Sequence, residues 1–523
     1  MRSRTAPILT VLLCLAVSGL SGCKVTTEDI DYWLGTQKGP GKIVAVLLAD
    51  KYEDDLRVYA GLALVRMEPR PPSHSQPPID GVTELQAAVR RLPDESRTRI
   101  VDAMVPGLIQ MMSGDASAET EGIPPLQIRA KDASFLVLPY ASDSQEETLR
   151  NAIIDWYAVD FNARNLAGNF SAEQVVRQLG APAAGRLVNA MTATLTQPEL
   201  VKVAELISTV GNSATKAAAA ERLVAIEREM ESEEFTDDLR ERLRAQLRRT
   251  RGEDTEINEE QVSAAAVLNR ENYITLGALP AMKHLNDQRV VQDRLLEMAQ
   301  VATVEGLAAP KIEDRRVKAL QAMEGGVRAD QVDTLVTLAL DGDTPIAVRD
   351  YSFDRIADSR STAAIPRLWP AFEAATDWRV RWRIGSLILT LGGGDVVQDF
   401  FSHLEDGDYA QEELHGYGER LGGMRPPPTA FVLGQLSSES WHDRAIALYF
   451  LERRAEADDV ARITALEGDE AETHGVHWAE QTTIGRLAAA VAGAVRQRLG
   501  QDSSETEDED GGDSDDASSD EGE

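Results

Sequence analysis

The sequence predicts an all-α fold: an α-solenoid of tandem helical hairpins, with a disordered acidic tail at the C-terminal end. Apolar residues recur at helical spacing along most of the chain, as at Ile43, Val44, Leu47 and Leu48. A short residue pattern also returns at a period close to that of one helical hairpin. Only 5% of residues are aromatic while 43% are hydrophobic, which favours a folded helical body over a β-sandwich or barrel.

Residues 1–22 are predicted to be a signal peptide. Arg2 and Arg4 give the segment a positive start, and the apolar run from Ala6 to Val17 is too short to span a bilayer comfortably. The segment ends in a stretch that resembles the bacterial lipobox, Leu20-Ser21-Gly22-Cys23. That resemblance implies lipidation of Cys23 by a thioether-linked diacylglyceride and an N-acyl (palmitate-type) chain, and several acyl chains give a stable anchor.

The cysteine count agrees with this interpretation. The only other cysteine, Cys14, lies in the segment that would be removed, so the mature chain would have no disulfide. An ordinary secretory signal with an incidental cysteine remains the alternative. Lys24 follows Cys23 where Asp is the familiar inner-membrane retention signal, so we expect anchoring in the outer membrane, facing the periplasm, with surface display left open.

Residues 23–42 are predicted to be the lipidated N-terminus and a tether, because glycine and proline are frequent there. Residues 43–500 are predicted to be the solenoid. Its repeat is an acidic residue or proline, then an aliphatic three positions on, an arginine directly after it, and apolar or small residues four and eight positions after the aliphatic. The copies are Glu53-Leu56-Arg57-Ala60-Leu64, Glu146-Leu149-Arg150-Ile153-Tyr157, Pro345-Val348-Arg349-Ser352-Ile356 and Asp377-Val380-Arg381-Ile384-Ile388.

The aliphatic and its two followers fall on one face of a helix, which that helix can bury against a neighbour. The segment from Leu338 to Leu404 resembles tandem HEAT repeats, especially the short HEAT-like type of bilin lyases. The resemblance lies in two helix junctions, Ile356-Ala357-Asp358 with Ala363 to Leu368, and Leu389-Thr390-Leu391-Gly392-Gly393-Gly394-Asp395. It implies that the aliphatics fill the core between helices, and that the acidic and arginine positions join adjacent repeats.

Three segments interrupt the expected array. The stretch from Pro69 to Pro78 is too rich in proline for a helix and is predicted to be an extended loop. The stretch from Ala217 to Arg251 is dense in Glu and Arg, which suggests either a long exposed helix pair or a hinge near residues 230–260. Residues 501–523 hold twelve acidic residues and no basic ones, so they are expected to form a disordered acidic tail.

Net charge limits the class of partner. The chain carries 54 Lys and Arg against 87 Asp and Glu, a formal charge of −33, which argues against a general nucleic-acid binder. For the tail, three roles stay open: a solvated chain, a weak and diffuse Ca²⁺ collector, or a segment that docks on a basic partner.

The sequence contains no nucleophile elbow, Walker phosphate loop or HExxH zinc helix, so no catalytic residue, cofactor or metal ligand is predicted. The run Gly392-Gly393-Gly394 is interpreted as a helix end. His474 and His477, with Glu472 and Glu480 nearby, are interpreted as solvated loop residues rather than a metal site.

The candidate interaction surface is a cluster of tryptophan and arginine, two residue types enriched at binding hot spots. The alternative is that the rings are packed between repeats with arginine stems over them. The cluster comprises Trp369, Trp378, Arg379, Arg381, Trp382 and Arg383.

These observations predict a membrane-anchored HEAT-repeat lipoprotein that serves as a non-enzymatic protein-protein interaction scaffold in the bacterial cell envelope. Its partners would be proteins, together with the membrane through Cys23. Two alternatives stay open: an enzyme or ligand-binding protein on a bilin-lyase-like HEAT scaffold, and a chaperone-like envelope factor. Fold resemblance cannot choose among them, because repeat scaffolds host unrelated functions.

Overall fold

The computed structural model describes residues 24–71, 79–114, 125–252, 256–478 and 480–500. Regular structure there is helical, apart from two isolated bridges between Arg70 and Ile79 and between Glu472 and Thr483. The all-α prediction is confirmed. The chain divides into two compact units, which meet in sequence between Arg294 and Leu295.

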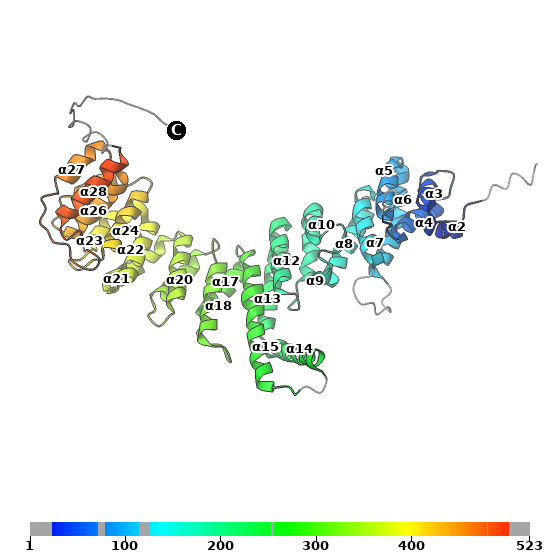
Figure 1. Cartoon of the computed structure of the whole chain (residues 1–523), viewed down its shortest axis with the longest axis horizontal. Helices are drawn as coiled ribbons and strands as arrows, with labels where there is room; N and C mark the ends of the chain where they lie inside the picture. Colours follow the sequence, from blue (N-terminus) through cyan, green and yellow to red (C-terminus); the bar gives the residue numbers. More distant parts are fainter. Residues whose placement is uncertain (1–23, 72–78, 115–124, 253–255, 479, 501–523) are drawn as a thin grey trace, which may run out of the picture. The chain divides into compact units, whose positions relative to one another are not determined.

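The first unit is built from a succession of helices (Figure 1). They are α2 (Thr27–Leu34), α3 (Gly39–Leu48), α4 (Asp54–Arg66), α5 (Gly81–Arg91), α6 (Asp94–Ser113), α7 (Pro125–Val137), α8 (Asp143–Val159), α9 (Phe161–Arg164), α10 (Ala172–Leu179), α11 (Ala181–Leu187), α12 (Gln197–Val210), α13 (Ser213–Glu231), α14 (Glu233–Arg251), α15 (Glu259–Tyr273), which continues into a π-turn, and α16 (Leu279–Lys283).

Helix α17 (Arg289–Gln300) carries the division between the units, and the second unit continues in the same way. Its helices are α18 (Ala309–Ala322), α19 (Val332–Leu340), α20 (Ile346–Ser359), α21 (Ile365–Ala374), α22 (Trp378–Gly392), α23 (Val397–Ser402), α24 (Gln411–Gly423), α25 (Thr429–Gln435), α26 (Trp441–Arg454), α27 (Val460–Thr464) and α28 (Ile484–Arg498).

Within each unit, helices pack on their sequence neighbours, as in a solenoid of helical hairpins. Helix α3 packs on α4 and α5, and α4 packs on α6. In the second unit α20 packs on α22, α22 on α24, and α24 on α26 (Figure 1). Each hairpin covers the apolar face of the one before it. In a single hairpin that face would be exposed to solvent, so the hairpin would not be stable alone.

The repeat positions supply the buried faces of these helices. Val348, Ser352 and Ile356 of α20 are fully buried, and so are Leu149, Ile153 and Tyr157 of α8. In these two copies the aliphatic position fills the core between helices, as the HEAT resemblance implies, whereas Leu56 and Val380 of the other two copies are only half-buried.

The repeat arginine caps the end of the preceding helix in two of the copies. Arg57 Nε donates to the carbonyl of Leu47 at 3.0 Å, and Arg349 Nε donates to the carbonyl of Ala339 at 3.1 Å. Both carbonyls lie in the last turn of a helix, where backbone acceptors lack partners within the helix. In these two copies the side chain thus joins two consecutive helices at the same place.

The tether predicted for residues 23–42 is wrong from Thr27 onward. Thr26 and Asp29 form a capping box that starts α2, and Ile30 of this helix is fully buried. Asp31 accepts a hydrogen bond from Tyr59 Oη at 2.6 Å, which fixes α2 to α4. Pro40 lies in the first turn of α3, where its missing N–H costs no helical hydrogen bond, so it starts that helix instead of breaking it.

The Glu- and Arg-rich stretch is a helix pair, the first of its two alternatives. Helices α13 and α14 are separated by Ser232 alone, which caps α14. Helix α14 then packs on α15 through an Arg244–Glu259 ion pair of 2.6 Å and an edge contact of the Phe235 and Tyr273 rings. The units divide well beyond the hinge expected near residues 230–260.

Several predictions fall outside the described residues: the signal peptide, Cys23, the acidic tail, and residues 72–78 of the Pro-rich loop. Among the helices that the structure does describe, none combines the length and apolar character needed to cross a bilayer.

Candidate functional site

The Trp and Arg cluster lies on α21 and α22 of the second unit, and the structure separates its members into different roles. Asp377 caps α22 by accepting a hydrogen bond from the backbone N–H of Arg379 at 2.9 Å. This cap fixes where the helix begins, and thereby which cluster residues face the solvent and which face the neighbouring helices.

Trp369 stands apart from the rest of the cluster. Its ring stacks on His403 with centroids 4.1 Å apart and planes 13° from parallel, and it meets the edge of Phe372. This side chain packs α21 on α23, as the packing interpretation expects.

Arg381 is a structural residue whose side chain is 17% exposed and joins α22 to α24. Its Nε and Nη2 donate to the two oxygens of Glu413 on α24, both at 2.7 Å, and Nη2 also donates to the carbonyl of Asp408 at 3.0 Å. Glu413 is fully buried and also accepts a hydrogen bond from Tyr417 Oη at 3.1 Å. Burial raises the pKa of Tyr417, so this hydroxyl keeps its proton and remains a donor.

Arg383 points to the preceding hairpin. Its guanidinium forms an ion pair with Asp354 of α20 and donates to the carbonyl of Asp350 at 3.4 Å. Arg381 and Arg383 therefore join three successive helical layers, in agreement with the role that the HEAT resemblance implies for charged positions.

Four residues of the cluster line an open cavity of about 560 Å³, here named the Trp/Arg cavity. They are Trp378, Arg379, Trp382 and Arg383. The Arg379 guanidinium lies over the Trp378 ring, 4.8 Å from its centroid, and is exposed to solvent. The cavity is lined by Asp350, Trp378, Arg379, Trp382, Arg383, Glu412, His415, Gly416 and Glu419. Four of the six predicted surface residues thus meet at one place.

His415 brings a titratable group to this cavity. Its Nε2 lies 3.7 Å from Glu452 Oε2, and its ring meets Tyr449 edge-on with centroids 4.8 Å apart. The neighbouring Glu452 carboxylate raises the pKa of His415, with the charge of Glu419 acting in the same direction.

Trp382 forms a wall shared by the Trp/Arg cavity and a second cavity. Its Nε1 is buried with no hydrogen-bond partner among the residues that the structure describes, and it lies against Gly416, where an added Cβ would come within 2.2 Å of that nitrogen. Only glycine at position 416 lets the indole ring lie flat on α24 in this way.

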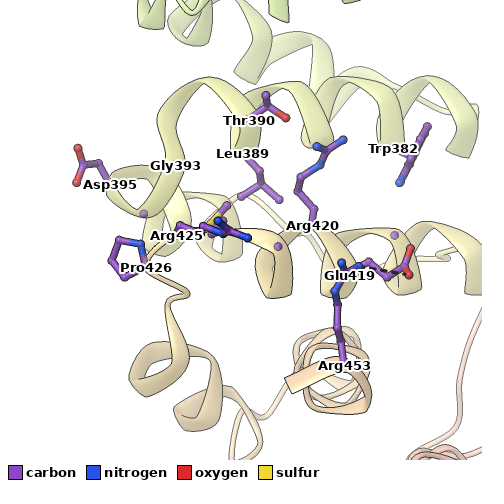
Figure 2. A pocket seen from close by; sticks show the side chains of 14 residues that line it. Trp382, Leu389, Thr390, Gly393, Asp395, Glu419, Arg420, Arg425, Pro426 and Arg453 are labelled. Carbon is purple, nitrogen blue, oxygen red and sulfur yellow. Dashed lines mark ion pairs between the residues drawn. The ribbon is translucent and has the colours of Figure 1, made fainter. Parts of the chain in front are cut away.

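The second cavity, here named the arginine pocket, has a volume of about 700 Å³ and lies between the C-terminal halves of α22 and α24. Figure 2 shows Arg420 and Arg425 close to its centre, with Arg453 of α26 below and Trp382 to one side. Glu419 and Arg453 face each other at 3.9 Å. Within the described residues, Arg420 and Arg425 have no carboxylate within ion-pair distance.

Sequence reasoning missed the arginine pocket because its three arginines come from one helix, a loop and another helix. Arg420 and Arg453 are 33 positions apart, close to one repeat, and only repeat stacking brings them together. One sequence signal did point here: α22 ends at Gly392 with Gly393 at φ 57°, as predicted, and Gly393 and Gly394 line this pocket.

The two histidines weighed as metal ligands lie in the loop before α28, as predicted. His477 Nδ1 is 2.6 Å from Glu412 Oε2, and the backbone carbonyl of His474 accepts from the N–H of Tyr409 at 3.0 Å. The described residues contain no group of three side chains arranged to hold a metal ion.

No protein-family model matches this chain, and no curated protein matches it either. Among solved structures, the chain is similar to one chain of the structure describing how Kap95p binding induces the switch loops of RanGDP to adopt the GTP-bound conformation. The two are 11% identical, the match covers 88% of this chain and 59% of that chain, and the TM-score is 0.23. The present chain therefore spans less than two thirds of that chain. A superposition at this score carries no argument, so the helical-repeat fold rests on the helix pairs described above.

Proposed function

We propose that this chain is a membrane-anchored lipoprotein that acts as a non-enzymatic scaffold for protein binding in the bacterial cell envelope. The observation that carries the proposal is the Trp/Arg cavity. It combines a half-buried tryptophan, an exposed arginine and a rigid support in one place.

The chemistry of the cavity suits a protein partner. Trp378 and Arg379 offer a flat ring and a guanidinium that can stack or form bidentate hydrogen bonds, the combination found at interface hot spots. Arg381 and Arg383 hold α22 in place beneath them through ion pairs to Glu413 and Asp354, so little ordering is left for the binding step. Glu412 and Glu419 supply acceptors on the facing helix.

Anchoring through Cys23 is supported by the lipobox resemblance and by the position of α2. Helix α2 begins at Thr27, so only Lys24, Val25 and Thr26 separate Cys23 from it. Three residues span at most ~10 Å, which would hold α2 close to the bilayer surface without a long tether. The outer membrane, facing the periplasm, is the proposed location because Lys24 follows Cys23.

The test is crosslinking of the tagged full-length chain in cells, followed by mass spectrometry of captured proteins. Trp378→Ala combined with Arg379→Glu should lose specific partners that wild type captures. The matched control is Arg360→Glu, which changes the charge of another exposed arginine of the second unit. Loss of the same partners in the control, or their retention in the cavity variant, would exclude this cavity as the binding site.

A small-ligand or enzymatic role on the same scaffold is the second candidate. The arginine pocket favours it, because about 700 Å³ falls within the usual range for ligand sites. Thermal-shift measurements of the full chain with anionic metabolites would reveal such a ligand by an increase in melting temperature that Arg420→Ala removes.

A further inference from the structure

We propose that the acidic C-terminal segment of this chain, residues 502–523, docks into the arginine pocket of the same molecule. The pocket offers positive charge that the rest of the second unit does not neutralise, and the segment begins close to it. The chain therefore carries its own occupant for this surface.

The arginine pocket carries positive charge. Arg420 and Arg425 have no ion-pair partner among the described residues, and Arg453 has only Glu419, at 3.9 Å. In Figure 2 the Arg420 side chain extends towards α22 and Arg425 lies nearer the Gly393 turn, whereas the Asp395 side chain is at the far edge. Guanidinium groups without counter-charges favour carboxylates, which they bind by paired hydrogen bonds.

The acidic segment follows α28, whose last turn contacts the end of α26. In the last turn of α28, Arg498 Nη2 donates to the carbonyl of Ala455 at 2.7 Å. Ala455 directly follows α26, and Arg453 of that helix lines the arginine pocket. The chain therefore leaves α28 beside the end of the helix that contributes to the pocket, and both ends belong to the second unit.

The acidic segment is long enough to reach the pocket. The 23 residues from 501 to 523 could extend to ~75 Å at about 3.3 Å per residue, so length is not limiting. A linked segment of this length meets a nearby site at an effective concentration on the order of millimolar, and weak charge pairs are then enough to hold it.

The acidic segment and the pocket carry opposite charges. The segment has twelve carboxylates and no cation, in a chain whose formal charge is −33. The negative net charge of the chain disfavours binding of such a segment in general, whereas Arg420 and Arg425 in the pocket lining attract it. Many registers of the segment satisfy the same three arginines, so docking needs no regular structure in it.

Docking would also affect the Trp/Arg cavity, because Trp382 and Glu419 line both cavities. An occupied arginine pocket would compete with any acidic partner segment that extends across Trp382. Competition with a partner rests on the proposed function, whereas docking of the acidic segment does not. Experiments can therefore disprove either one without the other.

The experiment is zero-length carbodiimide crosslinking of the full-length Arg425→Lys variant, with crosslinked peptides mapped by mass spectrometry. The substitution keeps the positive charge and supplies an amine that can couple to carboxylates. Arg360→Lys is the matched control, since it places a lysine on an exposed position of the same unit away from the pocket lining. Circular dichroism of both variants verifies that they are folded.

We expect intramolecular links from position 425 to residues 502–523 at about tenfold the yield from position 360, because a docked segment raises the local carboxylate concentration. The excess should vanish in ~1 M salt, where the Debye length is about 3 Å. Equal yields at the two positions, or no links to the segment, would overturn the proposal. Links found only in a dimer band would overturn it in favour of a second copy.

Discussion

Arg381 on α22 and Glu413 on α24 form a two-point ion pair in which both nitrogen–oxygen distances are 2.7 Å. Glu413 is fully buried, and Arg381 also lies over the ring of Tyr409 at 4.4 Å. This pair sets one hairpin against the next beneath the half-buried Trp378 and the exposed Arg379. The interior arginine of the cluster thus supports the surface on which its neighbours act.

Glu413→Gln is expected to destabilise the second unit by about 3 kcal/mol, because it leaves the Arg381 charge largely buried without its counter-charge. Urea denaturation, with hydrogen exchange of α22 and α24 as the local readout, measures the effect. Arg381→Met combined with Glu413→Leu should cost less than the sum of the two single changes. A Glu413→Gln variant as stable as wild type would show that the pair is not structural.

Arg349→Ala should weaken the junction of α19 and α20 by about 1–2 kcal/mol, since the carbonyl of Ala339 loses its donor at the helix end. Faster amide exchange confined to those two helices is the expected signature. Arg360→Ala, at an exposed position just after α20, provides the comparison and should leave exchange unchanged. The capping role assigned to the repeat arginine would be wrong if both variants behaved alike.

His415 should make the stability of the second unit depend on pH. Its pKa is raised in the folded state, chiefly by the neighbouring Glu452 carboxylate. A raised pKa means that the stabilisation is fully present below the unfolded pKa of about 6.5 and is lost as the pH rises through the folded pKa.

Wild type should therefore lose more stability than His415→Gln between about pH 6 and pH 8. The difference will be small because the side chain is 41% exposed and its charge is screened. Thermal melts across this range measure it. Parallel pH profiles for the two proteins would contradict the assigned shift.

Cys23→Ala is expected to move the protein from the membrane fraction to the soluble envelope fraction, because the anchor is proposed to be the acyl chains on that cysteine. Fractionation of cells followed by immunoblotting measures the distribution. Lys24→Asp is an informative companion, since it should change the membrane that holds the protein without releasing it. Unchanged retention of Cys23→Ala would count against lipidation.

The buried face of the repeat helix was predictable, because residues four positions apart lie on the same face of a helix. Val348, Ser352 and Ile356 are four residues apart and are all buried against neighbouring helices. The tether was mispredicted at Pro40, because the sequence alone does not distinguish a proline in the first turn of a helix from one that breaks a helix.

The binding surfaces were only partly predictable, since neighbours in sequence need not share a cavity. Trp369 and Trp378 are nine positions apart, yet Trp369 stacks on His403 while Trp378 opens to the Trp/Arg cavity. The three arginines of the arginine pocket left no local signal, because Arg420, Arg425 and Arg453 line one pocket only when α24 and α26 stack.

The most direct test of the scaffold proposal is site-specific photo-crosslinking in cells with a photoreactive amino acid at position 350, an exposed position of the Trp/Arg cavity lining that leaves Trp378 and Arg379 in place, and with position 360 as the control. The account predicts that position 350 captures a defined envelope protein, and that Trp378→Ala in the same chain abolishes the capture while position 360 does not reproduce it. Equal capture at both positions, or capture that persists with Trp378→Ala, would contradict the assignment of the Trp/Arg cavity as the partner-binding surface.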